Sequence, residues 1–174
     1  MSIEVAILVS ILLPTLACIS NVLHGETRPN LRDGITFLAA LGSFACVLTV
    51  LYKTSGEATE TLTLFAVMPG LEVAFGVEPL GLLFALIASG LWCVTHLYAV
   101  GYMRGNNEKK HPRFFAAFSI SIAATLALAF SANMFTLFIA YEVLTIATYP
   151  LVAHKETDEA KRGARIYLGI LMGT

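Results

Sequence analysis

Five long apolar stretches constrain the fold of this chain more than any other feature of its sequence. They cover residues 5–23, 35–52, 80–103, 113–130 and 134–153. Each is close to the roughly 20 apolar residues that a transmembrane helix needs. Only 13% of the residues are charged, against about 25% in soluble domains. Backbone polar groups in lipid must be hydrogen-bonded within their own segment, which selects helices. The sequence therefore predicts an all-α integral membrane protein with about five complete transmembrane helices.

A sixth apolar segment begins near Gly163 and runs to Thr174. It is shorter than a membrane span requires, so we expect a truncated sixth helix. We interpret the chain as a fragment of a longer protein. The alternative that stays open is a complete short subunit whose sixth helix is completed by a partner.

Basic residues are distributed unevenly among the connections between these helices. Of the 11 lysines and arginines, all except Lys53 lie in the segments 24–34, 104–113 and 154–165. With five spans these segments share one face of the membrane, and Lys and Arg mark the cytoplasmic face. We therefore expect a multi-pass protein of a bacterial cell (inner) membrane, with the N-terminus and residues 53–79 outside. The net charge is only −1, and no nucleic-acid partner is expected.

The segment between the second and third spans carries a different pattern. Residues 61–67 and 71–77 alternate polar and apolar side chains, and Pro69 and Gly70 stand between them. Such alternation indicates strands, and Pro followed by Gly suits a type II turn. We therefore predict an extracytoplasmic β-hairpin between the second and third helices.

Glu142 is the one acidic residue placed deep inside a span, in the stretch FIAYEVLTIATYPLV. A charge at the bilayer centre costs roughly 2.5–3.5 kcal/mol on insertion scales, and burial favours the neutral form of a carboxyl. We interpret Glu142 as a proton carrier, and a carboxyl that ties two helices together is the alternative. Thr145 and Tyr149 follow at i+3 and i+7 on one helical face and are candidates to line the proton route. Pro150 removes a backbone donor, so we expect a local helix break or a simple packing kink there.

His96 is the only histidine within a predicted span. Because histidine titrates near neutral pH, His96 is a candidate for proton transfer, and a buried imidazole that ties two helices is the alternative. Haem is not expected, since no second histidine is embedded as an axial ligand. Cys18, Cys46 and Cys93 stand singly in three spans, so we expect no zinc or iron–sulfur site. The sequence has no glycine-rich phosphate loop and no Ser/His/Asp signature, so we expect no cofactor and no catalytic residue.

Three segments of the sequence resemble a known family. They are FGVEPLGLLFALIASGLWCVTHLYAVGYMRG (75–105), RFFAAFSI (113–120) and ANMFTLFIAYEVLTIATYPLVAHKETDEA (132–160). They are similar to the N-terminal portion of the proton-conducting antiporter-like membrane subunits of respiratory complex I, membrane-bound hydrogenases and Mrp-type Na⁺/H⁺ antiporters.

The resemblance carries expectations about organisation and about Glu142. It implies that residues 1–79 form two helices and the outer hairpin, and that residues 80–174 begin the proton-translocation domain. It also implies that Glu142 matches the family's protonatable glutamate, whose usual partner is a lysine on a later helix. Other membrane subunits of a multisubunit complex are the implied protein partners.

The sequence therefore predicts a subunit of a proton-translocating or cation/proton antiporter membrane complex, with Glu142 as intramembrane proton carrier. Two other classes stay open, namely a non-conducting structural subunit and a membrane enzyme subunit that contributes to a quinone or haem site. Protons are the expected ion, and exchange of Na⁺ is left open. Membership of an ion-pumping complex of the NADH:quinone oxidoreductase-like or hydrogenase-like type is also left open, together with its driving reaction.

Overall fold

A computed structural model of the chain describes residues 1–54, 61–68, 70–106, 110–153 and 158–173. Five of its helices are long and apolar enough to cross a membrane. They are α1 (Ile3–His24), α2 (Pro29–Thr54), α3 (Pro79–Gly105), α4 (His111–Ala129) and α5 (Met134–Val152). The prediction of five complete spans is confirmed.

The helix starts follow from local sequence. The Ser2 hydroxyl accepts a hydrogen bond from the backbone N–H of Val5 at the start of α1, and Asn133 caps α5 in the same way. Proline stands in the first turn of α2, α3 and α4. A proline is tolerated there because the first N–H groups of a helix have no intrahelical partner.

The start of α2 is the boundary that the sequence analysis misplaced most. Residues 24–34 were expected to be a loop, but α2 already begins at Pro29. Arg32 and Asp33 therefore lie in its first turns, and both are buried. Their charges suggested a solvent-exposed connection, whereas in the fold the two side chains form an ion pair with each other.

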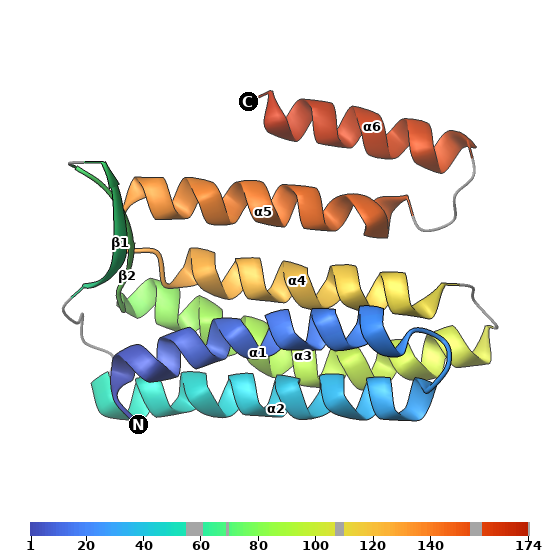
Figure 1. Ribbon diagram of the computed structural model, residues 1–174, viewed down its shortest axis with the longest axis horizontal. Helices are drawn as coiled ribbons and strands as arrows, with labels where there is room; N and C mark the ends of the chain where they lie inside the picture. Colours follow the sequence, from blue (N-terminus) through green and yellow to red (C-terminus); the bar gives the residue numbers. More distant parts are fainter. Residues whose placement is uncertain (55–60, 69, 107–109, 154–157, 174) are drawn as a thin grey trace.

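The helices run side by side, with consecutive ones antiparallel (Figure 1). α1 packs against both α2 and α4, α2 against α3, and α4 against α5. The N-terminus and the hairpin lie at one end of the bundle. The ends of α1, α3 and α5 and the starts of α2, α4 and α6 lie at the other (Figure 1). Among the described residues, Arg28, Arg104 and Arg113 lie at this second end. Which side of the membrane it faces stays a prediction.

Small and polar side chains hold the helices together inside the bundle. The Ser43 hydroxyl donates to the Ser10 carbonyl oxygen over 2.8 Å and joins α2 to α1. Asn21 on α1 donates to Ser119 of α4 over 3.4 Å and accepts from Thr36 of α2 over 3.2 Å. Hydrogen bonds of this kind are typical of helices that pack in lipid, where water does not compete.

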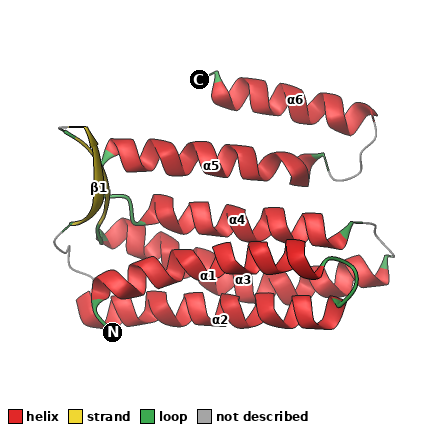
Figure 2. Cartoon of the chain, viewed as in Figure 1, coloured by secondary structure: helices red, strands yellow, loops and turns green. Residues whose placement is uncertain are grey.

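The predicted hairpin is present at the end of the bundle that holds the N-terminus (Figure 2). Strands β1 (Leu62–Met68) and β2 (Leu71–Phe75) pair antiparallel, with Leu62 opposite Phe75. Gly70 has φ +85°, which fits the third residue of a type II turn. Pro69, which was expected to precede it in that turn, lies outside the described residues.

The sixth helix, α6 (Asp158–Met172), begins five residues before the expected start near Gly163. It runs back along α5 at the edge of the structure (Figure 1). The Thr148 hydroxyl of α5 lies 3.4 Å from the Tyr167 hydroxyl of α6, and either oxygen can donate. This contact places the last residues of α6 beside the middle of α5.

Candidate functional site

Hydrogen bonds attach the start of α5 to the hairpin. The Asn133 side chain donates to the carbonyl oxygen of Glu72 over 2.8 Å. The Thr136 hydroxyl accepts from the backbone N–H of Ala74 over 2.9 Å. From Met134, the first residue of α5, a rise of 1.5 Å per residue places Glu142 about 12 Å along the helix. Glu142 therefore lies near the middle of the 19-residue helix.

Glu142 is half-buried and lines a cleft between α5 and α6. The cleft has a volume of about 510 Å³, and its other lining residues are Phe138, Tyr141, Leu171 and Met172. Within the described ranges, no hydrogen bond or ion pair to the Glu142 carboxyl is recorded. The carboxyl thus faces space that can hold water or another side chain, with apolar walls around it.

The residues expected to extend the polar stripe lie in different environments. Thr145 is buried, and its hydroxyl has no partner among the described atoms. Tyr149 is half-buried. Neither residue lines the cleft beside Glu142. α5 continues for two residues beyond Pro150, so this proline lies in the last turn and the helix is not interrupted at the proline itself.

His96 lies apart from Glu142, because α4 stands between α3 and α5 (Figure 1). Its Nε2 is 3.0 Å from the carbonyl oxygen of Asp33, and since a carbonyl only accepts, Nε2 carries the proton. The ring stacks on Phe37 at 6.4 Å and meets Phe115 edge-on at 5.3 Å. The side chain is 1% exposed, and no partner is recorded for Nδ1 among the described atoms. His96 therefore ties α3 to α2, which was the alternative interpretation of this residue, while its role in proton transfer stays a prediction.

Charged side chains lie next to the hydrogen bond between His96 and Asp33, and the sequence analysis did not predict this cluster. The Arg32 Nε donates to a carboxylate oxygen of Asp33 over 2.8 Å, and the other oxygen accepts from Arg104 over 2.6 Å. Arg32 also donates to the carbonyl of Gly25 over 3.0 Å and lies over the Phe115 ring. The first-turn position of Pro29 was the available signal, since proline often opens a helix and would have placed both charges inside α2.

Comparison with known proteins indicates the family of this chain. Residues 68–115 match the family model described as NADH-ubiquinone oxidoreductase (complex I), chain 5 N-terminus. NADH-quinone oxidoreductase subunit L of Mycobacterium tuberculosis is 32% identical over 66% of this chain and 19% of its own length. F420H2 dehydrogenase subunit L of Methanosarcina mazei is 29% identical over 81% of this chain and 21% of its own length. Na⁺/H⁺ antiporter subunit A1 of Staphylococcus aureus is 26% identical over 63% of this chain and 14% of its own length.

This chain belongs to the family of antiporter-like membrane subunits. The chain spans about a fifth of the length of the first of these relatives. The part of this chain that the family model matches includes His96 and Arg104, and it ends before Glu142. Together with the five long apolar helices, the family makes this a multi-pass membrane protein.

Proposed function

We propose that this chain contributes to a proton-translocating or cation/proton-exchanging membrane complex, in which Glu142 is an intramembrane proton carrier. One observation carries the proposal: a carboxyl in the middle of an apolar helix faces a cleft of about 510 Å³ and has no recorded partner among the described residues. An ionisable side chain within a membrane span is costly and is usually retained for function.

The arrangement suits reversible protonation. A carboxyl that is not held by a fixed hydrogen bond or ion pair can take up a proton and release it when a cation approaches, because a nearby positive charge favours the ionised form. The cleft leaves room for that approach from the α6 side. The buried Thr145 hydroxyl and the Tyr149 hydroxyl toward the end of α5 then provide donors and acceptors along the helix. His96 enters this proposal only as a second protonatable group, on the far side of α4.

The same proposal includes the orientation of the chain in the membrane, its partners and the ion. The end of the bundle that carries the basic connections faces the cytoplasm of a bacterial cell, and the hairpin faces outward. The protein partners are other membrane subunits of the complex. The proton is the ion that Glu142 carries, and exchange of Na⁺ is left open. The relatives' names, which refer to oxidoreductases and to a Na⁺/H⁺ antiporter, support both a redox-driven complex and an exchanger.

Substitution of Glu142 in the full-length protein within its complex tests the carrier role. Glu142→Gln keeps size and hydrogen-bonding capacity but cannot titrate, so proton-coupled transport in membrane vesicles should nearly stop at normal assembly. Glu142→Asp should retain part of the transport. Glu26→Gln, an exposed carboxyl between α1 and α2, is the matched control and should transport as wild type does.

Two results would count against the proposal. Equal transport by Glu142→Gln and wild type, at equal amounts of assembled protein, would leave Glu142 as a structural carboxyl. Visible-light absorbance from a bound chromophore that disappears on Glu142→Gln substitution would instead indicate a haem or quinone-type site.

A further inference from the structure

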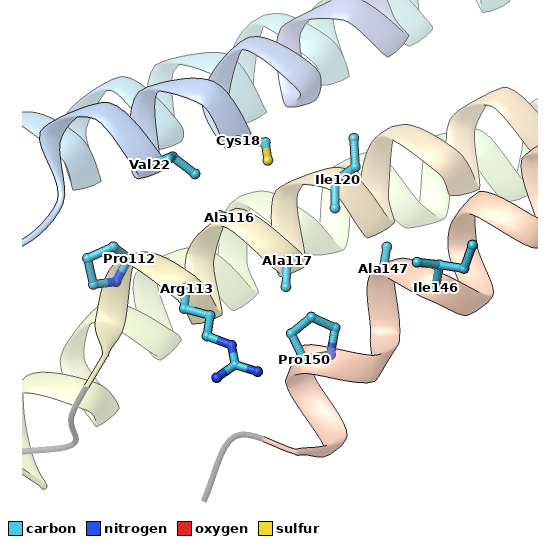
Figure 3. Close-up of a pocket in the computed structure, with 10 residues that line it drawn as sticks. All are labelled: Cys18, Val22, Pro112, Arg113, Ala116, Ala117, Ile120, Ile146, Ala147 and Pro150. Carbon is cyan, nitrogen blue, oxygen red and sulfur yellow. The ribbon is translucent and has the colours of Figure 1, made fainter. Parts of the chain in front are cut away.

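A second cleft, on a different part of the molecule from Glu142, lies where α1, α4 and α5 approach the end with the basic connections (Figure 3). Its volume is about 500 Å³, within the range of small-ligand sites. The walls are formed by Cys18 and Val22 of α1, Ala117 and Ile120 of α4, and Ile146 and Ala147 of α5. Arg113 and Pro150 lie at its outer end (Figure 3).

The cleft exists because small side chains meet where two helices flank a third. α1 and α5 both pack on α4. The α4 surface between them is formed by Ala116 and Ala117, and α5 presents Ala147 opposite. Methyl groups do not fill the space that remains between α1 and α5.

The lining of the cleft is apolar except at the end where Arg113 lies. Among the described residues that line the cleft, Arg113 is the only one with a charged side chain, and the others present carbon apart from the Cys18 thiol. Figure 3 shows the Arg113 guanidinium extending from the start of α4 toward Pro150 at the end of α5. A ligand that fits this cleft is therefore apolar along its length and negatively charged at one end.

The length of the cleft indicates which apolar ligand fits. On α4 its residues run from Pro112 to Ile120, which is about 12 Å at 1.5 Å per residue. One leaflet of a bilayer has about 15 Å of hydrocarbon, half of the total 30 Å. A further transmembrane helix, 10–12 Å wide, would need a groove along the whole bundle, whereas this cleft occupies one leaflet only.

We propose that this cleft binds one anionic phospholipid from the leaflet next to the basic connections. Its phosphodiester pairs with Arg113, and one acyl chain lies between α1 and α5 over the alanines of α4. Arginine suits the headgroup because its planar donor fork matches phosphate oxygens. The bound chain fills the space that the alanines leave and holds α5 at a fixed distance from α1. This binding does not depend on Glu142 carrying a proton.

Photo-cross-linking in the full-length protein within its complex tests the proposal. The probes are phosphatidylglycerol and phosphatidylcholine, each with a photoactivatable group in the acyl chain, in vesicles of otherwise equal composition. Phosphatidylglycerol should label the peptides that contain Val22 and Ile146. Arg113→Gln should lower that labelling about fivefold, the factor that corresponds to the loss of about 1 kcal/mol from a direct hydrogen bond to the phosphate. Arg28→Gln, an exposed arginine at the same end of the bundle that does not line the cleft, is the matched control and should leave labelling unchanged.

A second variant tests the acyl-chain position without altering charge. Val22 is 66% exposed, so Val22→Trp can fill the cleft from its rim and should abolish labelling of the Ile146 peptide. Equal labelling by the two lipids, with no effect of Arg113→Gln, would overturn the proposal. A photo-reactive residue at position 22 that cross-links to another polypeptide segment would also overturn it, because protein would then occupy the cleft.

Discussion

Replacing Asp33 by asparagine removes the negative charge that Arg32 and Arg104 share. Arg32 is 1% exposed, so water cannot replace the lost carboxylate. Removing one partner of a buried ion pair costs about 3–5 kcal/mol. The Gly25 carbonyl and the Phe115 ring still contact Arg32, so the expected loss lies near 3 kcal/mol of the free energy of unfolding. A cooperative unit of about 150–250 residues shifts its unfolding midpoint by about 2–4 °C per kcal/mol. The midpoint of the Asp33→Asn variant should therefore fall by about 6–12 °C.

The free cysteines of the chain provide the assay. Cys18, Cys46 and Cys93 are unpaired and at least half-covered, so a thiol-reactive fluorophore reports unfolding of the full-length protein in detergent. Arg104→Gln is the comparison variant: its side chain is 43% exposed, and a pair of that kind contributes at most about 1 kcal/mol. Its midpoint should therefore fall by no more than about 4 °C.

A double variant separates the charge effect from a general loss of packing. Arg32→Met together with Asp33→Asn removes the buried cation as well, and an apolar replacement of a whole pair is often neutral or stabilising. The double variant should be more stable than Asp33→Asn alone. If Asp33→Asn stays within about 1 kcal/mol of wild type, or if the added Arg32→Met lowers the midpoint further, the reasoning is refuted.

Two further predictions concern the hairpin and the orientation. Thr136→Val leaves the buried N–H of Ala74 without its acceptor, so it should cost about 1–3 kcal/mol in the same thermal assay. Thr49→Val is its control and should have little effect, since that hydroxyl bonds only within its own helix at an exposed site; equal midpoints for the two variants would contradict the anchoring role of Thr136. In intact cells, an impermeant thiol reagent should label Thr61→Cys beside the hairpin and not Asn106→Cys at the end of α3. The reverse pattern would invert the proposed topology.

The five spans and the hairpin could be predicted because their patterns are local. Apolar length selects a span whatever surrounds it, and alternation around a Pro-Gly pair selects a hairpin. The start of α2 was missed although Pro29 offered a local signal, because two charged residues follow it closely. Arg32 and Asp33 suggest a solvated loop until Arg104, which lies 71 residues further along the chain, is brought beside them by the packing of α3 on α2.

The candidate site was predicted only in part. Helical spacing placed Thr145 and Tyr149 on the same face as Glu142, but spacing does not say which neighbours cover that face. In the fold Thr145 is buried, while Glu142 borders the cleft toward α6. The interhelical position of His96 likewise depends on Asp33 offering its carbonyl oxygen, a backbone atom that no side-chain pattern can reveal.

The attachment of the hairpin has a consequence for sequence variation. The Ala74 N–H donates to Thr136, the Ala74 carbonyl accepts from the backbone of Ala132, and the Glu72 carbonyl accepts from Asn133. The hairpin contributes only main-chain atoms to these bonds, so substitutions along β2 can accumulate in related proteins while α5 keeps its position. Asn133 and Thr136 contribute their side chains and are not interchangeable in this way. We therefore expect variable residues in the hairpin together with constant residues in the first turn of α5, because the proposed carrier role of Glu142 requires α5 to keep its position.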